Sequence, residues 1–593
     1  MTARSFGGIE LSRAAPAPAP GPLDDRLYDL VEARFRDVAE SEPTWATQLG
    51  IHAWDDRLPD PSRERLLGDV QRDKAHLAAI EALDDAGLSP EARFERDLEL
   101  HHVRLRVFRA ETVRTWERRS NGASALGDAL FPLFTRDFAP LAERLSAIAA
   151  RLEAAPAFLR GYRSRAVVPQ VREWLEVELR SSGNVPSFLD DIVGAADQAG
   201  ATVPEVERKR LERAVDRARI AIEDQAEWLR EILPGATGAW PLGRDRYGEL
   251  LQLRAFDGLD ADAILEIGWQ QLEENHAARA AAAREIDPDA TEAEVVDRVK
   301  GDHPPTFEAA LDRYRDDMGR ARRYLIDHAI ATVPPDERVE VIATPPYLRG
   351  VMPFAAYFEP ARWDPSPVGV YVVTPAVDDN PNALREHYRA SISNTSIHEA
   401  YPGHHLQLAL ASRHASLTRA QVDAPEFVEG WGMYSEQMMR EQGFDAEPNF
   451  RLNMHTDAIW RACRIILDVR MHRGEISIDD ATRFLVAETS FETANARAEV
   501  RRYTYTPTYQ LSYLLGKVLL LQLRADEQAR LGSAFSLRDF HDILLRNGSL
   551  PISFHRRLLR ERLGAAAGSG VSTSADGDGS GNGGSGAKRA ART

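Results

Sequence analysis

Apolar side chains recur at a helical spacing over most of residues 23 to 332, and this pattern constrains the fold most strongly. Residues three and four apart share one face of an α-helix. One such face carries Leu27, Leu30, Val31, Phe35 and Val38, and another carries Leu211, Val215, Ala218, Ile222 and Leu229. Further helices are predicted near 60–85, 91–117, 139–155, 260–286 and 306–331. The pattern predicts a mainly α protein with a large helical body.

Turn-forming segments separate the predicted helices. The sequences GNVPS at 183–187 and LPGATGAWPLG at 233–243 contain proline and glycine, which interrupt helices. Thr202 and Glu205 stand three residues apart before the second apolar face, a spacing typical of a capping box. We therefore expect breaks at both segments and a capped helix beginning after Thr202.

The residue pattern changes after position 332. Residues 337 to 375 are rich in β-branched and aromatic residues, which favours short strands at about 338–343, 354–358 and 368–374. Helical patterns resume after about 381. We expect a single domain over 23–563, made of a helical half (23–332), a small sheet (333–380) and a second helical half (381–563). The strand near 368–374 is a candidate for pairing with an extended peptide.

Both ends of the chain have low-complexity composition. Residues 1–22 are rich in alanine and proline, and residues 564–593 are rich in glycine and serine. We expect disordered tails at both ends. The start lacks the apolar region of a secretory signal, and no run reaches the roughly 18–20 apolar residues of a membrane helix. The expected location is cytoplasmic.

The charge and the cysteine content narrow the function classes. The formal net charge is −18, which disfavours binding to nucleic acid or to an anionic membrane surface. The chain has one cysteine, Cys463, so an intrachain disulfide and a four-thiolate zinc site are both excluded. A bound metal would need histidine and carboxylate ligands.

The segment HEAYPGHHLQ at 398–407 has the strongest chemical signal. In the motif HExxH, two histidines one helical turn apart bind zinc, and the glutamate acts as base. Here Pro402 occupies the second histidine position, and the next histidines are His404 and His405. Pro402 and Gly403 predict a break in which two extra residues loop out. This would bring His404 to the metal beside His398 and leave His405 in the second shell.

A third ligand is expected downstream, in PEFVEGWGMYSE at 425–436. Glu429 follows His404 by a spacing that suits a helix, a turn and a returning helix. The glycines after Glu429 would allow close packing against the metal helix. Glu436 lies on a similar face and is a second-shell candidate.

These motifs resemble the bacterial domain-of-unknown-function family 885 (DUF885), whose members are regarded as gluzincin-like zinc peptidases. The family pattern is HExxPGHxxQ followed by EGW, and this chain matches it fully. Asp468 with His472, Arg502-Tyr503, Pro507 and the segment from Tyr513 to Lys517 resemble the family's later motifs. The resemblance implies a helical body with a deep cleft and His404 rather than His405 as ligand. The residue pattern of 337–375, just upstream of the metal segment, adds the expectation of a small sheet beside the metal helix.

The expected function is that of a zinc-dependent hydrolase acting on peptides or small amides. Zn²⁺ would bind to His398, His404 and Glu429, and Glu399 would be the general base. An oxyanion donor is expected from the tyrosine-rich segment 503–513, where Tyr513 is preferred over Tyr503 and Tyr509. The remaining candidates for second-shell or substrate-binding roles are His405, Glu436, Arg502, Tyr503 and His472.

Alternative chemistries fit part of the pattern. Two histidines and one carboxylate also describe non-haem iron sites. A zinc hydrolase of a non-peptide amide or ester and a binding module without catalysis are further alternatives. Aminopeptidase, carboxypeptidase and oligopeptidase activities all agree with the sequence, and the oligomeric state is not predicted.

Overall fold

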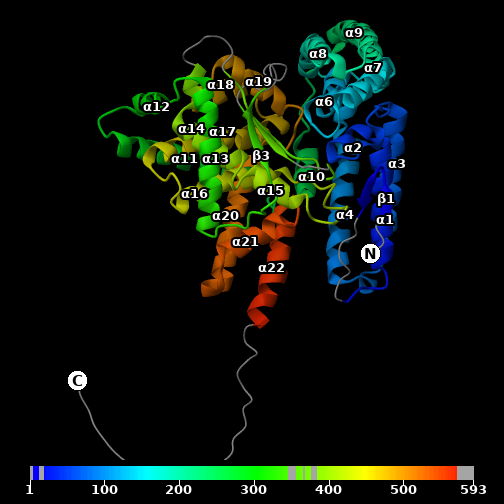
Figure 1. Cartoon of the computed structure of the whole chain (residues 1–593). Helices are drawn as coiled ribbons and strands as arrows, with labels where there is room; N and C mark the ends of the chain where they lie inside the picture. Colours follow the sequence, from blue (N-terminus) through cyan, green and yellow to red (C-terminus); the bar gives the residue numbers. More distant parts are fainter. Residues whose placement is uncertain (1–3, 12–18, 345–354, 365–367, 376–382, 570–593) are drawn as a thin grey trace, which may run out of the picture.

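Helices form most of the molecule, as the spacing of the apolar residues predicts (Figure 1). The computed structural model of the chain describes residues 4–11, 19–344, 355–364, 368–375 and 383–569. The predicted mainly α fold is confirmed. None of the helices in these ranges is both long and apolar enough to span a membrane.

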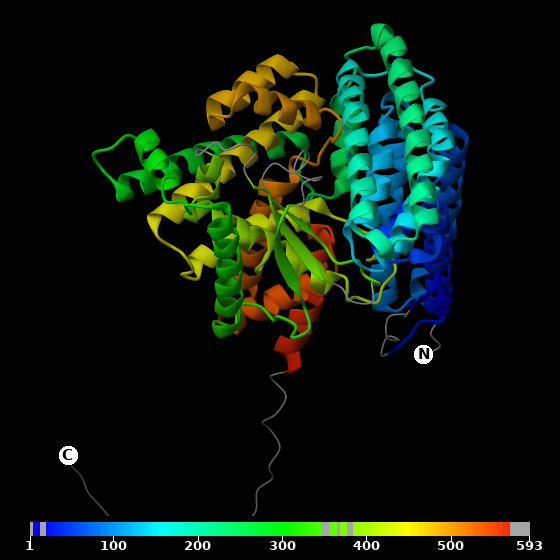
Figure 2. The ribbon, with the colours of Figure 1, turned by 45° about the horizontal axis from the view of Figure 1, so that its top comes forward.

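The first helices build a side body, drawn from blue to blue-green in Figures 1 and 2. They are α1 Asp24–Ser41, α2 Pro43–Leu49, α3 Arg63–Glu81, α4 Pro90–Phe108, α5 Thr115–Arg118, α6 Gly122–Thr135, α7 Leu141–Arg163, α8 Arg172–Gln198 and α9 Glu205–Ile232. A π-helical turn, Arg109–Val113, follows α4. Helices α6 to α9 enclose an apolar core of their own, which includes Leu130, Leu152, Leu189 and Ile222.

The remaining helices surround the largest core. They are α10 Arg244–Arg254, α11 Ala261–Ile286, α12 Glu292–Lys300, α13 Phe307–Asp327, α14 Arg389–Glu399, α15 His404–Ala411, α16 Pro425–Glu441, α17 Pro448–His472, α18 Ile478–Thr489, α19 Thr493–Tyr503, α20 Ser512–Leu531, α21 Leu537–Leu545 and α22 Ile552–Ser569. Leu250, Ile264 and Leu325 join residues of α16, α17 and α20 in this core. Helices α10, α11 and α13 therefore pack with the later helices, so the boundary near 332 does not separate two cores.

A three-stranded sheet lies in the middle of this body. Its strands are β3 Val339–Ala343, β4 Ala355–Phe358 and β5 Gly369–Val373, close to the predicted positions. Their order is β3-β5-β4, with β3 parallel and β4 antiparallel to β5. The central strand is β5, so both of its edges are paired. The prediction that the strand near 368–374 pairs with a peptide is therefore wrong, and β4 is an outer strand instead.

Four other predictions need correction. Residues Arg4–Phe6 and Ile9–Leu11 pair as an antiparallel hairpin, and Leu11 is buried, so this part of the 1–22 tail is folded. Helix α22 continues to Ser569, beyond the predicted end at 563. Parts of both predicted tails and of the 333–380 segment lie outside the described residues. The residues concerned are 1–3, 12–18, 345–354, 365–367, 376–382 and 570–593.

The other two corrections concern helix boundaries. Helix α8 runs through GNVPS with Pro186 inside it. Burial of Val185 and Leu189 in the core of the α6–α9 body outweighs the local preference for a break. Thr202 donates its hydroxyl to Ala199 and does not cap α9, which begins after Pro204. A capping box exists instead at Thr291 and Glu294 of α12.

A cleft lies where the side body meets the later helices. Its cavity measures 740 Å³ and is lined from one side by α3 and α4 and from the other by residues 421–425 and 505–509. A second cavity of 380 Å³ is lined by His398, Glu399 and His404 of the HEAYPGHH segment. A cleft, as the resemblance implied, is thus present.

Candidate metal site

The helix carrying His398 breaks where the sequence predicts. Helix α14 ends at Glu399, and α15 begins at His404. Across the break, the amide of Leu406 donates to the carbonyl of Ala400 at 3.3 Å, so two extra residues are looped out relative to an α-helical turn. The Tyr401–Pro402 peptide bond is cis. A Cβ atom at Gly403 would lie 1.8 Å from the carbonyl oxygen of His398, so the loop has room only for glycine.

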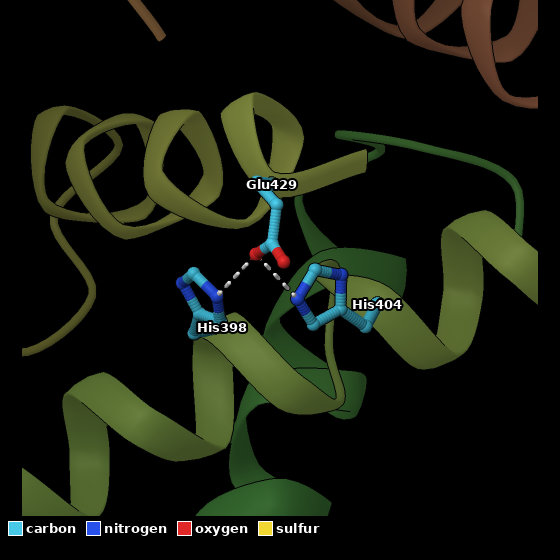
Figure 3. A group of neighbouring side chains, drawn as sticks. All are labelled: His398, His404 and Glu429. Atoms are coloured by element: carbon cyan, nitrogen blue, oxygen red, sulfur yellow. Dashed lines mark ion pairs between the residues drawn. The ribbon is translucent and has the colours of Figure 1, made fainter. Parts of the chain in front are cut away.

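The break brings three side chains together (Figure 3). The imidazole rings of His398 and His404 lie 4.7 Å apart, centroid to centroid. Glu429 Oε2 lies 3.8 Å from His398 Nε2 and 3.4 Å from His404 Nε2. All three potential ligand atoms lie within 4.8 Å of one another. A tetrahedral ion with bonds of about 2.0–2.2 Å separates its ligand atoms by about 3.4 Å, which fits this spacing.

The glycines of EGWG explain how α16 approaches so closely. A Cβ atom at Gly432 would lie 2.6 Å from Cε1 of His398, so Gly432 makes room for the imidazole. A Cβ atom at Gly430 would lie 2.6 Å from the backbone of Gly516 on α20. The close packing predicted for these glycines is confirmed, but Gly430 serves the contact with α20 rather than the contact with α14.

Two neighbouring side chains hold the ligands in place. Glu436 Oε1 lies 2.7 Å from His398 Nδ1, and Asn394 donates to the other oxygen of Glu436 at 2.9 Å. A proton on Nδ1 directs the lone pair of Nε2 towards the cluster. The hydroxyl of Tyr509 donates to Glu429 Oε1 at 2.9 Å, so Oε2 is the oxygen left for an ion.

The electrostatics of the cluster favour a cation. Burial lowers the pKa of His398, but the Glu429 and Glu436 carboxylates outweigh burial and raise it to about 10. Burial raises the pKa of Glu429, but His398 and His404 hold it well below its usual range. With Glu399, three carboxylates surround two imidazoles. This donor set fits Zn²⁺, which binds histidine nitrogen and carboxylate oxygen.

The cavity of 380 Å³ surrounds the cluster. Glu399 is half-buried and lines the cavity together with His398, His404 and Glu429. Tyr513 lines it from α20, and Ala355, Ala356 and Tyr357 line it from strand β4. The predicted sheet beside the metal helix is therefore present. The structure brings the predicted base, the predicted oxyanion donor and the three predicted ligands into one cavity.

His405 points away from the cluster. Its Nε2 lies 2.6 Å from Glu337 Oε2, and its Nδ1 lies 2.9 Å from the hydroxyl of Tyr357. Tyr401 donates to the same oxygen of Glu337 at 2.6 Å, and Arg322 donates to the other at 2.8 Å. His405 therefore belongs to a buried network beside the sheet. It forms no hydrogen bond with the three predicted ligands, and its link to the cavity is the hydrogen bond with Tyr357.

Three further candidates also lie outside the cavity. Arg502 pairs with Glu499 at 2.9 Å, and the hydroxyl of Tyr503 donates to the same carboxylate at 3.0 Å. Buried His472 lies 3.0 Å from the carbonyl of Tyr503 and stacks on Tyr247. None of these three lines the cavity, because α19 and the end of α17 turn them towards the packing between helices.

Sequence reasoning missed several residues of the site. Asn394 precedes His398 by one helical turn, so its spacing was a usable signal. Arg461 and Arg464 line the cavity from α17, but no motif marks them. Glu337 precedes β3, and nothing local in the sequence connects it to His405. Tyr509 was considered only as an oxyanion donor, whereas its hydroxyl contacts Glu429.

Fold and site together define a mainly α-helical protein with a two-histidine, one-glutamate candidate metal site in a cavity. Within that class, the chain belongs to the family described as "Bacterial protein of unknown function (DUF885)", whose model matches residues 43–559. The resemblance noted from the motifs is thereby confirmed at the level of the family. No curated protein matches the chain.

Two solved structures share the fold. One is described as a putative lipoprotein of unknown function from Shewanella oneidensis; it is 22% identical, with a TM-score of 0.74, and the match covers 90% of this chain and 99% of that one. The other is described as a putative lipoprotein from Colwellia psychrerythraea. It is 18% identical, with a TM-score of 0.81, and the match covers 91% of this chain and 99% of that one. At these identities the likeness extends to the fold alone.

Proposed function

We propose that this protein is a zinc-dependent hydrolase that cleaves peptide bonds. The observation that carries the proposal is the convergence of His398, His404 and Glu429 in a cavity that Glu399 also lines. The ligand spacing suits a tetrahedral ion, and a carboxylate next to the first histidine is the usual base of such a site.

The residues of the chain have distinct roles in this proposal. Zinc bound by His398, His404 and Glu429 would supply a Lewis acid that acidifies water and polarises a carbonyl. Glu399 accepts the proton from the attacking water and delivers it to the leaving amine. Tyr513 faces the same cavity and donates to the oxygen that becomes negatively charged. Glu436 keeps His398 in the tautomer and orientation for binding.

Strand β4 supports a peptide as substrate over other amides and esters. Within the described residues, β4 pairs only with β5 and is one of the two outer strands of the sheet. Three of its residues line the cavity beside Glu399. An outer strand next to a hydrolytic site can hold an extended peptide by main-chain hydrogen bonds.

A peptide digest with a matched variant tests the proposal. The zinc-loaded protein should cleave members of a peptide library, and the cleavage should stop with a chelator and return with Zn²⁺. Glu399→Gln should bind zinc normally but lose at least about a thousandfold in kcat, since both proton transfers depend on this carboxylate.

Two results would contradict the proposal. Full activity of Glu399→Gln would remove the assigned base. Iron instead of zinc in protein purified without added metal would favour an oxygenase, which uses the same ligand types.

A further inference from the structure

Two arginines line the cavity that holds the metal cluster. Arg461 and Arg464 lie three residues apart on α17, and the side chain of Trp460 contacts both. Their guanidinium carbons lie 4.2 Å and 4.0 Å from the centroid of the Trp460 ring. Such stacking fixes the position of a guanidinium group while its edge remains available for hydrogen bonds.

The charge on Arg464 is only partly compensated. Arg464 Nη2 lies 3.1 Å from Glu499 Oε2, and Arg502 binds the same oxygen. One carboxylate thus serves two guanidinium groups, which leaves one positive charge unmatched. The side chain of Arg464 is only 4% exposed, and its Nη1 has no hydrogen-bond partner within the ranges that the structure describes.

Arg461 also has unused donors. Its nearest carboxylate is Asp457, at 3.5 Å, and Asp457 already accepts hydrogen bonds from the amides of Asn394 and Asn453. The Nε of Arg461 is buried and has no partner among the described residues. Because Asp457 is shared in this way, the positive charge of Arg461 is only partly neutralised, and the cavity beside it suits an anionic ligand.

The two cavities lie on either side of the contact between Tyr509 and Glu429. Tyr509 lines the larger cleft of 740 Å³ and donates to Glu429, which lines the smaller cavity of 380 Å³. A peptide bound across Glu429 would therefore have one end near Arg461 and Arg464 and the rest in the cleft. The smaller cavity is near the lower end of the size range of small-molecule sites, so it holds one or two residues.

We propose that Arg461 and Arg464 bind the C-terminal carboxylate of the substrate. Arginine pairs recognise carboxylates through paired N–H donors. This inference rests on the proposed function and makes the enzyme an exopeptidase that acts at the C-terminus. Water adds its hydroxyl to the scissile carbonyl and its proton to the leaving nitrogen. The C–N bond breaks, and the products are a shortened peptide and a free amino acid or dipeptide.

The first test compares matched peptides in a cleavage assay. An N-acetylated hexapeptide with a free C-terminal carboxylate should lose one or two C-terminal residues, as read by mass spectrometry. The same peptide with a C-terminal carboxamide should be cleaved at least 100-fold more slowly in kcat/KM. Equal cleavage of the two peptides, or cleavage only at internal or N-terminal bonds, would overturn the inference while leaving the proposed hydrolase in place.

A binding experiment tests the inference without turnover. Zinc-loaded Glu399→Gln should bind the carboxylate peptide at least tenfold more tightly than the carboxamide in calorimetry. Arg461→Gln and Arg464→Gln, each combined with Glu399→Gln, should remove this preference. Arg451→Gln is the control, because Arg451 lies on the same helix but pairs with exposed Glu285.

The variants also separate binding from folding. Arg464→Lys replaces Arg464→Gln in this experiment if the glutamine variant proves unstable. The lysine retains a positive charge and should keep part of the preference for the carboxylate peptide. If the carboxylate and carboxamide peptides bind with equal affinity, the inference is overturned even where cleavage is observed. If the preference is present but no peptide is hydrolysed, the carboxylate site stands and the proposed function fails.

Discussion

Single hydrogen bonds decide which atoms of the cluster face an ion. Glu436 binds Nδ1 of His398, and Tyr509 binds Oε1 of Glu429. Each bond leaves one atom, Nε2 or Oε2, directed at the common centre. His404 has no equivalent bond, because its buried Nδ1 lacks a partner among the described residues. The two adjacent histidines therefore differ sharply in environment, with His404 in the cluster and His405 on Glu337.

This difference predicts opposite behaviour for two alanine variants. His404→Ala should weaken zinc binding by more than about 100-fold, since loss of a ligand exceeds the usual effect of an outer-shell change. His405→Ala should leave zinc affinity within a few-fold but lower the free energy of unfolding by about 2 kcal/mol, because Glu337 loses a charged hydrogen bond. Zinc competition with a chromophoric chelator and urea denaturation measure the two effects. Zinc loss in His405→Ala alone would reverse the ligand assignment.

The ligands could be predicted from the sequence because their geometry is set locally. Pro402 and Gly403 interrupt the helix, and the two looped-out residues place His404 beside His398. The contacts of Glu337, Tyr509 and Arg464 could not be predicted, because each depends on how distant helices pack. Tyr513 was chosen for its motif, and the structure places it in the cavity, while Tyr503 from the same segment turns away.

Glycines at the contacts with α14 and α20 determine where α16 lies. Gly432 faces the imidazole of His398, and Gly430 faces Gly516 on α20. Any side chain at these positions would push α16 away from α14 or from α20. Because α16 carries both Glu429 and Glu436, such a shift would move a ligand and the residue that orients another ligand.

Gly432→Ala should therefore impair metal binding without unfolding the protein. The added methyl group would overlap the His398 ring, so we expect zinc affinity to fall by about 10- to 100-fold. Gly194→Ala on α8 is the control, since a Cβ atom there has nothing within 4 Å. That change should leave zinc affinity intact and raise stability by up to about 1 kcal/mol. Unchanged zinc affinity in Gly432→Ala would show that α16 can move freely.

Glu337 connects several elements through one carboxylate. It accepts hydrogen bonds from Arg322 of α13, from Tyr401 and from His405 of α15, and it lies just upstream of β3. Burial raises the pKa of Glu337, but these three partners lower it to about 2, from 4.5 in the absence of such contacts. The ionised carboxylate therefore stabilises the folded state.

The sign of the pH effect follows from this lowered pKa. The stabilisation is complete above the unfolded-state pKa and is lost as the pH falls through the folded-state value. At about pH 7, Glu337→Gln should lower the free energy of unfolding by about 2 to 3 kcal/mol. The difference from the wild type should shrink by about half at about pH 3. Urea denaturation between about pH 3 and about pH 7 measures this difference in the free energy of unfolding. A difference that stays constant with pH would exclude Glu337 as the titrating group.

The packing of the whole molecule could be predicted from the sequence less well than its elements. Strands β3, β4 and β5 lie within a residue or two of their predicted positions, whereas the sequence did not show that the largest core contains residues from both sides of position 332. Periodicity identifies which residues of a helix are buried but does not identify the helix against which they pack. The continuation of α8 through GNVPS has the same cause, because packing of Val185 and Leu189 is not visible locally.

Buried polar contacts join the side body to the later helices. Glu95 of α4 binds Arg419, which lies between α15 and α16, at 2.7 Å. Glu99, one turn further along α4, accepts a hydrogen bond from Thr418 at 2.8 Å. Both halves of the Glu95–Arg419 pair are less than 10% exposed, at 7% and 6%. The segment they fix leads directly into α16 and hence to Glu429.

Breaking this pair should destabilise the fold and disturb the cluster together. Arg419→Ala leaves Glu95 buried without its partner, so we expect a loss of about 3 to 5 kcal/mol in unfolding free energy. The double variant Glu95→Ala/Arg419→Ala should lose less than the sum of the single variants, since neither charge is then stranded. Lys209→Ala is the control; its exposed pair with Glu205 should contribute less than about 1 kcal/mol. If the single losses simply add, Glu95 and Arg419 act independently, and the side body is held to the later helices by apolar packing instead.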